Sequence, residues 1–275
     1  MTRHDHELAG NRGSARAGIG ARIRAWPRPS AVSDHVGGSS CESGAGGPGG
    51  HVLIMPGIGY TVDRPLLYWA ARALSWDGWS VDRLWLDLPD VVDFPRTIDR
   101  MNGLVDSWVS GITSSGHDDD SVMVVTKSLS TLTYPHLVDR GLPAVLLTPV
   151  LNPPPCDPAE SVITVPDSGI SSSDAAPLLC AGDADPYFDG ARAASLTGQG
   201  LVRVYPKANH SIEVSGDWST SIRYLRDVTE SIVRYGSVVR GVRRGHSEDG
   251  ESLVHTANDA GTRDARNGGI RDEHE

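Results

Sequence analysis

The chain has 275 residues, enough for one or two domains of ordinary size. Its 35 acidic residues outnumber its 25 basic residues, and the net charge of -10 argues against nucleic acid as a partner, because phosphate backbones repel an acidic surface. Its apolar runs are far shorter than the roughly 20 residues that cross a bilayer, so we expect no membrane partner either.

The first 50 residues are rich in Gly, Ser and Arg and poor in aliphatic side chains, and we expect them to form a disordered tail. This segment contains no apolar run as long as a signal-peptide core. The three cysteines, Cys41, Cys156 and Cys180, are widely spaced and form no CxxC pair. These features predict a cytoplasmic protein with neither a disulfide framework nor a zinc site.

Residues 51–238 are expected to form one domain, in which short aliphatic runs alternate with longer amphipathic stretches. Aliphatic runs without strict alternation predict strands that are covered on both faces, and the intervals between them predict crossover helices. These runs are 51–55, 81–86, 122–126, 143–148, 177–182 and 201–205. The pattern predicts the α/β class, with an open, mostly parallel sheet of about six strands and helices on both faces.

Two further segments are expected to lack regular structure. The Pro-rich residues 152–176 predict a long connection with at most one short strand. Residues 239–275 are dense in charges of both signs and almost free of aliphatic periodicity, which predicts a second disordered tail.

The third aliphatic run ends in Thr126-Lys127-Ser128-Leu129-Ser130 and passes directly into a helical pattern. A serine on such a strand-to-helix turn, with small residues two positions before and after it, fits the geometry of a nucleophile elbow. The simpler interpretation is that Ser128 only caps the helix, and this segment alone does not decide between the two.

Two later strand ends carry the other groups that a serine nucleophile needs. Asp185 follows the fifth aliphatic run and His210 follows the sixth, so the order along the chain is Ser, Asp, His. Taken separately, Asp185 is interpreted as a turn residue or helix cap and His210 as a surface histidine. Because the carboxyl ends of parallel strands meet at one edge of a sheet, their joint occurrence predicts a catalytic triad with Ser128.

The first aliphatic run is followed by the glycine-bearing loop Pro56-Gly57-Ile58-Gly59-Tyr60. Such a loop can turn a backbone N–H toward the serine, and the N–H groups of Ile58 and Leu129 are the predicted oxyanion-hole donors. A plain glycine-rich turn is the alternative. A phosphate-binding loop is not favoured, because neither GxGxxG nor GxxxxGK[ST] is present.

These motifs resemble the α/β-hydrolase superfamily, over nearly all of residues 51–238. The similarity is greatest to small lidless members related to dienelactone hydrolase, through the segment Pro56-Gly57-Ile58-Gly59-Tyr60-Thr61-Val62-Asp63-Arg64-Pro65-Leu66-Leu67-Tyr68. The resemblance implies a minimal α/β-hydrolase fold with Ser128 as nucleophile, Asp185 as acid and His210 as base. It favours Asp185 over Asp183, because the acid follows the strand-end glycine by three residues in similar proteins.

The chain departs from this family at two points. Thr126 and Ser130 stand where the elbow usually has glycines, and we expect the two strands that open the larger family fold to be missing.

Residues around the predicted triad are candidates for substrate binding, namely Gly57, Gly59, Tyr60 and Lys127. Lys127 is either an ion-pair or strand-end residue or a contact for an anionic substrate. Asp63 and Arg64 either order the oxyanion loop through an ion pair or touch substrate. Asp189 is expected to open the helix that follows it.

The predicted function is hydrolysis of a small ester or thioester through an acyl-enzyme, in an open site with no metal or organic cofactor. The alternative is a non-catalytic binding or regulatory protein on the same fold. An exposed edge strand leaves a homodimer possible.

Overall fold

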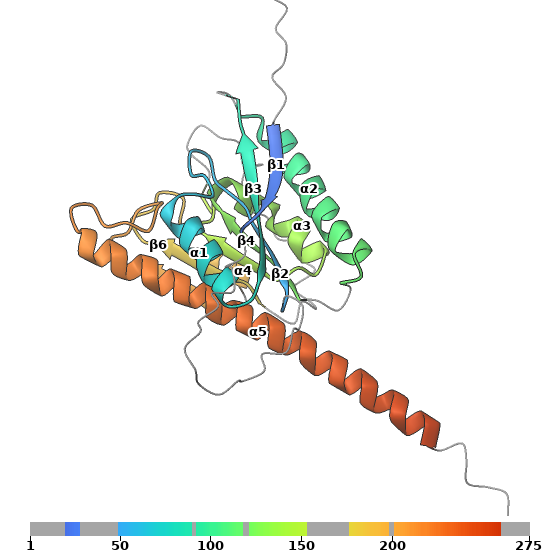
Figure 1. The fold of residues 1–275 in the computed structure, drawn as a ribbon. Coiled ribbons are helices and arrows are strands. Elements are labelled where there is room, and N and C mark those ends of the chain that lie inside the picture. The colour runs from blue at the N-terminus through green and yellow to red at the C-terminus, as the bar shows by residue number, and fades with distance from the viewer. Residues whose placement is uncertain are drawn as a thin grey trace, which may run out of the picture.

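A computed structural model describes residues 20–27, 49–89, 92–117, 121–152, 176–197 and 201–259 of this chain, with side chains up to residue 241. Seven strands form one sheet in the order β1-β3-β2-β4-β5-β6-β7 (Figure 1). All neighbouring strands are parallel except β1 and β3, which are antiparallel. The strands are β1 (Gly20–Ala25), β2 (His51–Ile54), β3 (Ser80–Asp87), β4 (Val122–Lys127), β5 (Ala144–Leu147), β6 (Leu178–Gly182) and β7 (Leu201–Tyr205).

Helices cover both faces of the sheet. The helices are α1 (Pro65–Trp76), α2 (Phe94–Ser114), α3 (Tyr134–Asp139), α4 (Gly190–Thr197) and α5 (Trp218–Asp259), with a 3-10 helix, η1 (Ser128–Thr133), directly after β4. Buried side chains of α1 and α5 pack on one face and those of α2, α3 and α4 on the other. Successive residues of a strand point to opposite faces, so Val52 enters the first core and Leu53 the second.

The expected class, an open and mostly parallel sheet with helices on both faces, is confirmed. The sheet has seven strands where about six were expected, because β1 lies within residues 1–50, the segment expected to be a disordered tail. Six residues of β1 pair with β3, and Ala21 and Ile23 pack on the core. Trp26, directly after β1, lies under the Arg83 guanidinium, 4.3 Å from the ring centroid.

At the other end of the domain, α5 has 42 residues and continues past residue 238, the expected end of the domain, to Asp259. In Figure 1 it runs along α1 and extends beyond the sheet. Val239 is buried, and Arg240 forms an ion pair with Asp77 and stacks over Trp79. These contacts stabilise the helix beyond the expected boundary. Predictions for 1–19, 28–48, 153–175 and 260–275 concern residues outside those that the structure describes.

Among the described helices, none combines the length and apolar character needed to cross a membrane.

Candidate active site

Ser128 lies at the turn between β4 and η1, at the carboxyl edge of the sheet. Its φ of 52° is in the left-handed region, which is uncommon for a residue other than glycine. The residue before it, Lys127, is still extended, with φ -140° and ψ 133°. The chain therefore reverses from strand to helix within a single residue, as a nucleophile elbow requires.

Thr126 and Ser130, which replace the usual glycines, are fully buried and hydrogen-bonded. The Thr126 hydroxyl donates to the Val145 carbonyl at 2.9 Å and so joins β4 to β5. The Ser130 hydroxyl accepts from the Lys127 N–H at 2.9 Å and lies 3.2 Å from the Met55 carbonyl. Both side chains thus fit at the turn between β4 and η1, and their buried hydroxyl groups are hydrogen-bonded.

The three residues predicted as a triad form a continuous hydrogen-bonded chain. His210 Nε2 lies 2.8 Å from Ser128 Oγ, and His210 Nδ1 lies 2.8 Å from Asp185 Oδ2. The Asp185 side chain is completely buried, whereas 28% of the His210 side chain is exposed. Asp185 Oδ1 accepts the Tyr187 N–H at 2.9 Å, so both carboxylate oxygens have a partner. The Tyr187 ring packs edge-on against the imidazole, with centroids 4.9 Å apart.

Lys127 is 1% exposed and is directed away from solvent. Its ammonium donates to Thr148 Oγ1 and to the His210 carbonyl, both at 3.0 Å, and lies 4.2 Å from the centre of the Tyr60 ring. Burial lowers the pKa of Lys127 to about 8, although Asp185 and Glu213 act in the opposite direction.

The expectation that Lys127 and Tyr60 bind substrate therefore has no support in this geometry. The Lys127 ammonium is buried beneath the proposed base, and Tyr60 covers it. The Tyr60 hydroxyl accepts the Leu66 N–H at 3.1 Å, near the start of α1. Burial raises the pKa of Tyr60 to about 12, so its hydroxyl stays neutral at ordinary pH. Lys127 thus contacts the His210 backbone from the protein interior, and Tyr60 packs against Lys127.

The loop after β2 is closed by two backbone hydrogen bonds. The Gly57 N–H donates to the Tyr60 carbonyl at 3.1 Å, and the Tyr60 N–H donates to the Gly57 carbonyl at 3.4 Å. Ile58 and Gly59 form its tip, where Gly59 has a φ of 64°. Gly57 lies directly against the serine, since a Cβ on Gly57 would be 2.9 Å from Ser128 Cβ. Leu129 is the second residue of η1, where backbone N–H groups lack helical partners. The loop and the η1 start thus flank Ser128.

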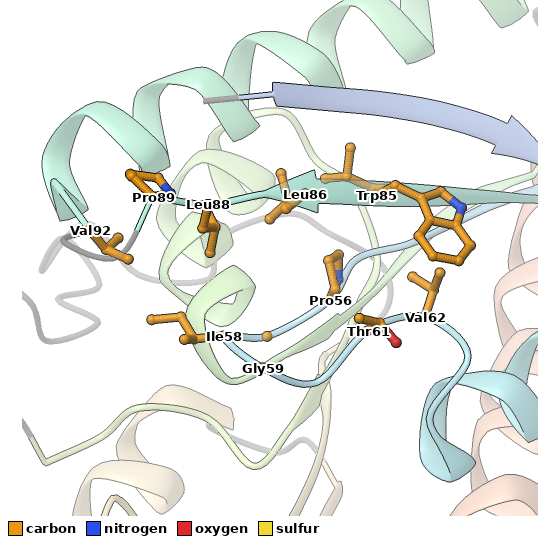
Figure 2. Close-up of a pocket in the computed structure, with 12 residues that line it drawn as sticks. Pro56, Ile58, Gly59, Thr61, Val62, Trp85, Leu86, Leu88, Pro89 and Val92 are labelled. Atoms are coloured by element: carbon orange, nitrogen blue, oxygen red, sulfur yellow. The ribbon is translucent and has the colours of Figure 1, made fainter. Parts of the chain in front are cut away.

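An apolar cavity of about 390 Å³ opens beside this loop (Figure 2). Among its walls are Gly57 and Gly59, two of the predicted substrate-binding residues. The remaining lining residues are Pro56, Ile58, Thr61, Val62, Leu84, Trp85, Leu86, Leu88, Pro89 and Val92. Sequence reasoning did not single out the β3 side of this cavity, although the strand-end rule that identified Ser128 applies equally to Leu88 and Pro89.

The remaining acidic candidates have structural partners. Asp63 pairs with Arg83 at 2.8 Å, which favours the loop-ordering interpretation over substrate contact. Asp183 accepts the Lys207 N–H and is exposed, so it does not replace Asp185. Asp189 accepts the Arg192 N–H at 2.9 Å in the first turn of α4, which confirms its predicted place at the helix start.

No protein-family model and no curated protein matches the sequence. Solved structures do resemble it. An α/β serine hydrolase homologue from Coxiella burnetii is 14% identical, with a TM-score of 0.49, over 78% of this chain and 90% of that one. A serine hydrolase without a lid from Xanthomonas campestris is 16% identical, with a TM-score of 0.49, over 79% and 87%. The fold is similar to that of the α/β serine hydrolases.

A structure of a carboxylesterase from Nitrososphaera gargenis is 9% identical to this chain, with a TM-score of 0.49, over 82% of this chain and 97% of that one. At such low identity the likeness concerns the path of the chain alone. The chemistry of this protein is therefore argued from its own residues.

Proposed function

We propose that this protein is a serine hydrolase that cleaves a small ester or thioester through an acyl-enzyme intermediate. The observation that carries the proposal is the chain of two 2.8 Å hydrogen bonds from Ser128 through His210 to Asp185. A nucleophile, a base and a group that orients the base are the minimum for acyl transfer.

In the first half-reaction, Ser128 Oγ attacks the substrate carbonyl carbon and His210 Nε2 takes the hydroxyl proton. The resulting imidazolium is stabilised by the Asp185 carboxylate, which the Tyr187 N–H holds in position. The N–H groups of Ile58 and Leu129 are the proposed donors to the oxyanion. When the intermediate collapses, the carbon–oxygen or carbon–sulfur bond to the leaving group breaks, and His210 Nε2 gives the proton to that group.

In the second half-reaction, a water molecule replaces the leaving group. His210 Nε2 takes a proton from the water as its oxygen attacks the acyl carbon, and returns the proton to Ser128 Oγ when the ester bond to the enzyme breaks. The products are a carboxylic acid and an alcohol or thiol, so water is the only co-reactant that the cycle consumes.

The backbone of Ser128 also supports a catalytic role. A non-glycine residue in the left-handed region costs on the order of 1 kcal/mol or more and persists where the surroundings enforce it. Here the buried hydroxyls of Thr126 and Ser130 anchor both sides of the turn, and the strained residue, Ser128, carries the hydroxyl that ends the hydrogen-bonded chain. A helix cap alone gives no reason for this arrangement.

The test is reaction of the purified protein with a fluorophosphonate probe, together with hydrolysis of short p-nitrophenyl esters and acyl-thioesters. We expect labelling at Ser128, and we expect Ser128→Ala to lose both labelling and at least about 10⁴-fold in kcat. Ser107→Ala, at an exposed serine of α2, is the matched control and should change neither. If the folded wild-type protein is neither labelled nor active, the proposal is wrong and the non-catalytic binding protein is favoured.

A further inference from the structure

The apolar cavity beside the oxyanion loop, hereafter the β3 pocket, lies next to the proposed triad but is not used by the mechanism above. One wall is the loop Pro56–Gly59, and the opposite wall is the end of β3 with the residues that follow it, Leu88, Pro89 and Val92 (Figure 2). Thr61 and Val62 close one end of the cavity. The question is which part of a substrate this pocket accepts.

The strand order relates the position of the β3 pocket to that of the proposed triad. Across the sheet the order is β3, β2, β4, β5, β6, β7, and Ser128 follows β4 while His210 follows β7. The β3 pocket lies over the ends of β2 and β3, so it is on the side of Ser128 opposite to His210. Gly57 connects the two regions, because it lines the pocket and is also in close contact with Ser128.

The chemistry of acyl transfer then fixes the orientation of the substrate. The leaving group must lie near His210 Nε2, because that nitrogen donates the proton to it. The other substituent of the carbonyl carbon, the acyl chain, must therefore point away from His210, toward β2 and β3. The β3 pocket is a cavity on that side.

We propose that the β3 pocket binds the acyl chain, and that the substrates are esters or thioesters of apolar carboxylic acids of medium length. This inference rests on the proposed function. The twelve described lining residues include no ionisable side chain, so a charged acyl group would lose its hydration without gaining a partner. A volume of about 390 Å³ is at the small end of ligand pockets, which favours chains of moderate size over bulky ones.

Ile58 provides a second reason. Its side chain is 48% exposed at the edge of the pocket, although it is a large aliphatic group and its own N–H is a proposed oxyanion donor. An acyl chain in the pocket would cover part of this surface. Each methylene removed from water contributes a factor of about four to binding, so selectivity should increase with chain length until the pocket is filled.

The experiment compares kcat/KM for p-nitrophenyl acetate, butyrate and hexanoate. We expect the wild-type ratio of hexanoate to acetate to exceed tenfold. Leu88→Trp and Val92→Phe, which fill the pocket from the β3 side, should each lower that ratio at least tenfold. Leu201→Trp, at an exposed leucine of β7, is the matched control and should keep the wild-type ratio.

A binding measurement separates the inference from the proposed function. Titration calorimetry of Ser128→Ala with N-methylhexanamide and N-methylacetamide should show tighter binding of the longer amide, and Leu88→Trp should remove that difference. Ester hydrolysis with a chain-length ratio unaffected by both pocket variants would overturn the acyl assignment and leave the hydrolase proposal standing. Absence of any ester or thioester hydrolysis, even with pocket-dependent amide binding, would overturn the hydrolase proposal and the acyl assignment together.

Discussion

The Lys127 ammonium donates a hydrogen bond to the His210 carbonyl at 3.0 Å, which joins the residue before the proposed nucleophile to the residue that carries the proposed base. The two residues are 83 positions apart in the sequence. A second bond, to Thr148, fixes the ammonium, and the Tyr60 ring covers it. The hydrogen bond from Lys127 thus holds the His210 loop in place from the protein interior. Because the ammonium is buried, its charge is not available to a substrate.

Burial of this lysine makes stability depend on pH. Its pKa is about 8 in the folded protein and about 10.5 in the unfolded chain. Between these values the unfolded chain binds a proton that the folded protein does not, so this group makes the free energy of unfolding rise with pH. The full effect is on the order of 3 kcal/mol, and Lys127→Met should lack it.

Urea unfolding of both proteins at pH 7.5 and pH 10.5 measures this contribution. Buried tyrosines with raised pKa values, such as Tyr60 and Tyr134, oppose the trend but are common to both proteins, so they cancel in the difference. We expect wild type to gain stability relative to Lys127→Met across this interval. Parallel pH profiles would show that the lysine is not desolvated as described.

Asp185→Asn should abolish the proposed hydrolase activity without unfolding the protein. An amide in place of the carboxylate favours the wrong imidazole tautomer and no longer stabilises the imidazolium, which in serine proteases costs about 10⁴-fold in kcat. Steady-state kinetics with a p-nitrophenyl ester measure the loss. Asp183→Asn is the matched control, because Asp183 is exposed and lies two residues before Asp185 in the sequence. This variant should keep a kcat near that of wild type. Similar losses in both variants would argue against a specific role for Asp185.

The sequence predicted the sheet and the grouping of Ser128, Asp185 and His210, because both depend on local signals. Aliphatic runs mark buried strands, and parallel strands bring their carboxyl ends to one edge, so Ser128, Asp185 and His210 could be grouped without coordinates. The strand β1 was missed because Gly20–Ala25 contains two arginines and few aliphatic residues. Its pairing with β3 and the stacking of Arg83 on Trp26 exist only in the folded chain.

The environment of Lys127 was beyond sequence reasoning for a related reason. A lysine at the end of a strand is usually exposed, and only the approach of Thr148 and the His210 carbonyl gives its ammonium partners inside the protein. The strand-end rule points to Leu88 and Pro89, but the β3 pocket was missed because its two walls approach each other only through the order of strands β2 and β3. Tertiary contacts of this kind leave no periodic signal.

Gly182→Ala should disrupt the proposed site at a distance from the serine. A Cβ at the end of β6 would lie 2.0 Å from the Ala208 carbonyl oxygen, so the His210 loop would have to move. That movement would break the 3.1 Å hydrogen bond from the Ala184 N–H to the Ala208 carbonyl. Asp185 and His210 would then move apart. We expect destabilisation of about 1–3 kcal/mol or more and loss of most activity, measured by thermal unfolding and ester hydrolysis.

Gly103→Ala is the control for that variant. Gly103 lies inside α2, and apart from the backbone of its own helix and its chain neighbours no described atom is within 4 Å of the added Cβ, so alanine should be neutral or stabilising by up to about 1 kcal/mol. Wild-type activity in Gly182→Ala would show that the two loops are not coupled through this contact.

Gly57→Ala tests the oxyanion loop directly. The added methyl group would be 2.9 Å from Ser128 Cβ and 3.2 Å from the Lys127 carbonyl oxygen, so the loop must move away from the serine and carry the Ile58 N–H with it. Loss of one oxyanion donor costs about 10²–10³-fold in kcat, and we expect a decrease of that size in ester hydrolysis. Because the loop is at the surface end of β2, the melting temperature should fall much less than in Gly182→Ala. A decrease confined to KM would mean that Gly57 shapes the substrate pocket and that the oxyanion is stabilised by other donors.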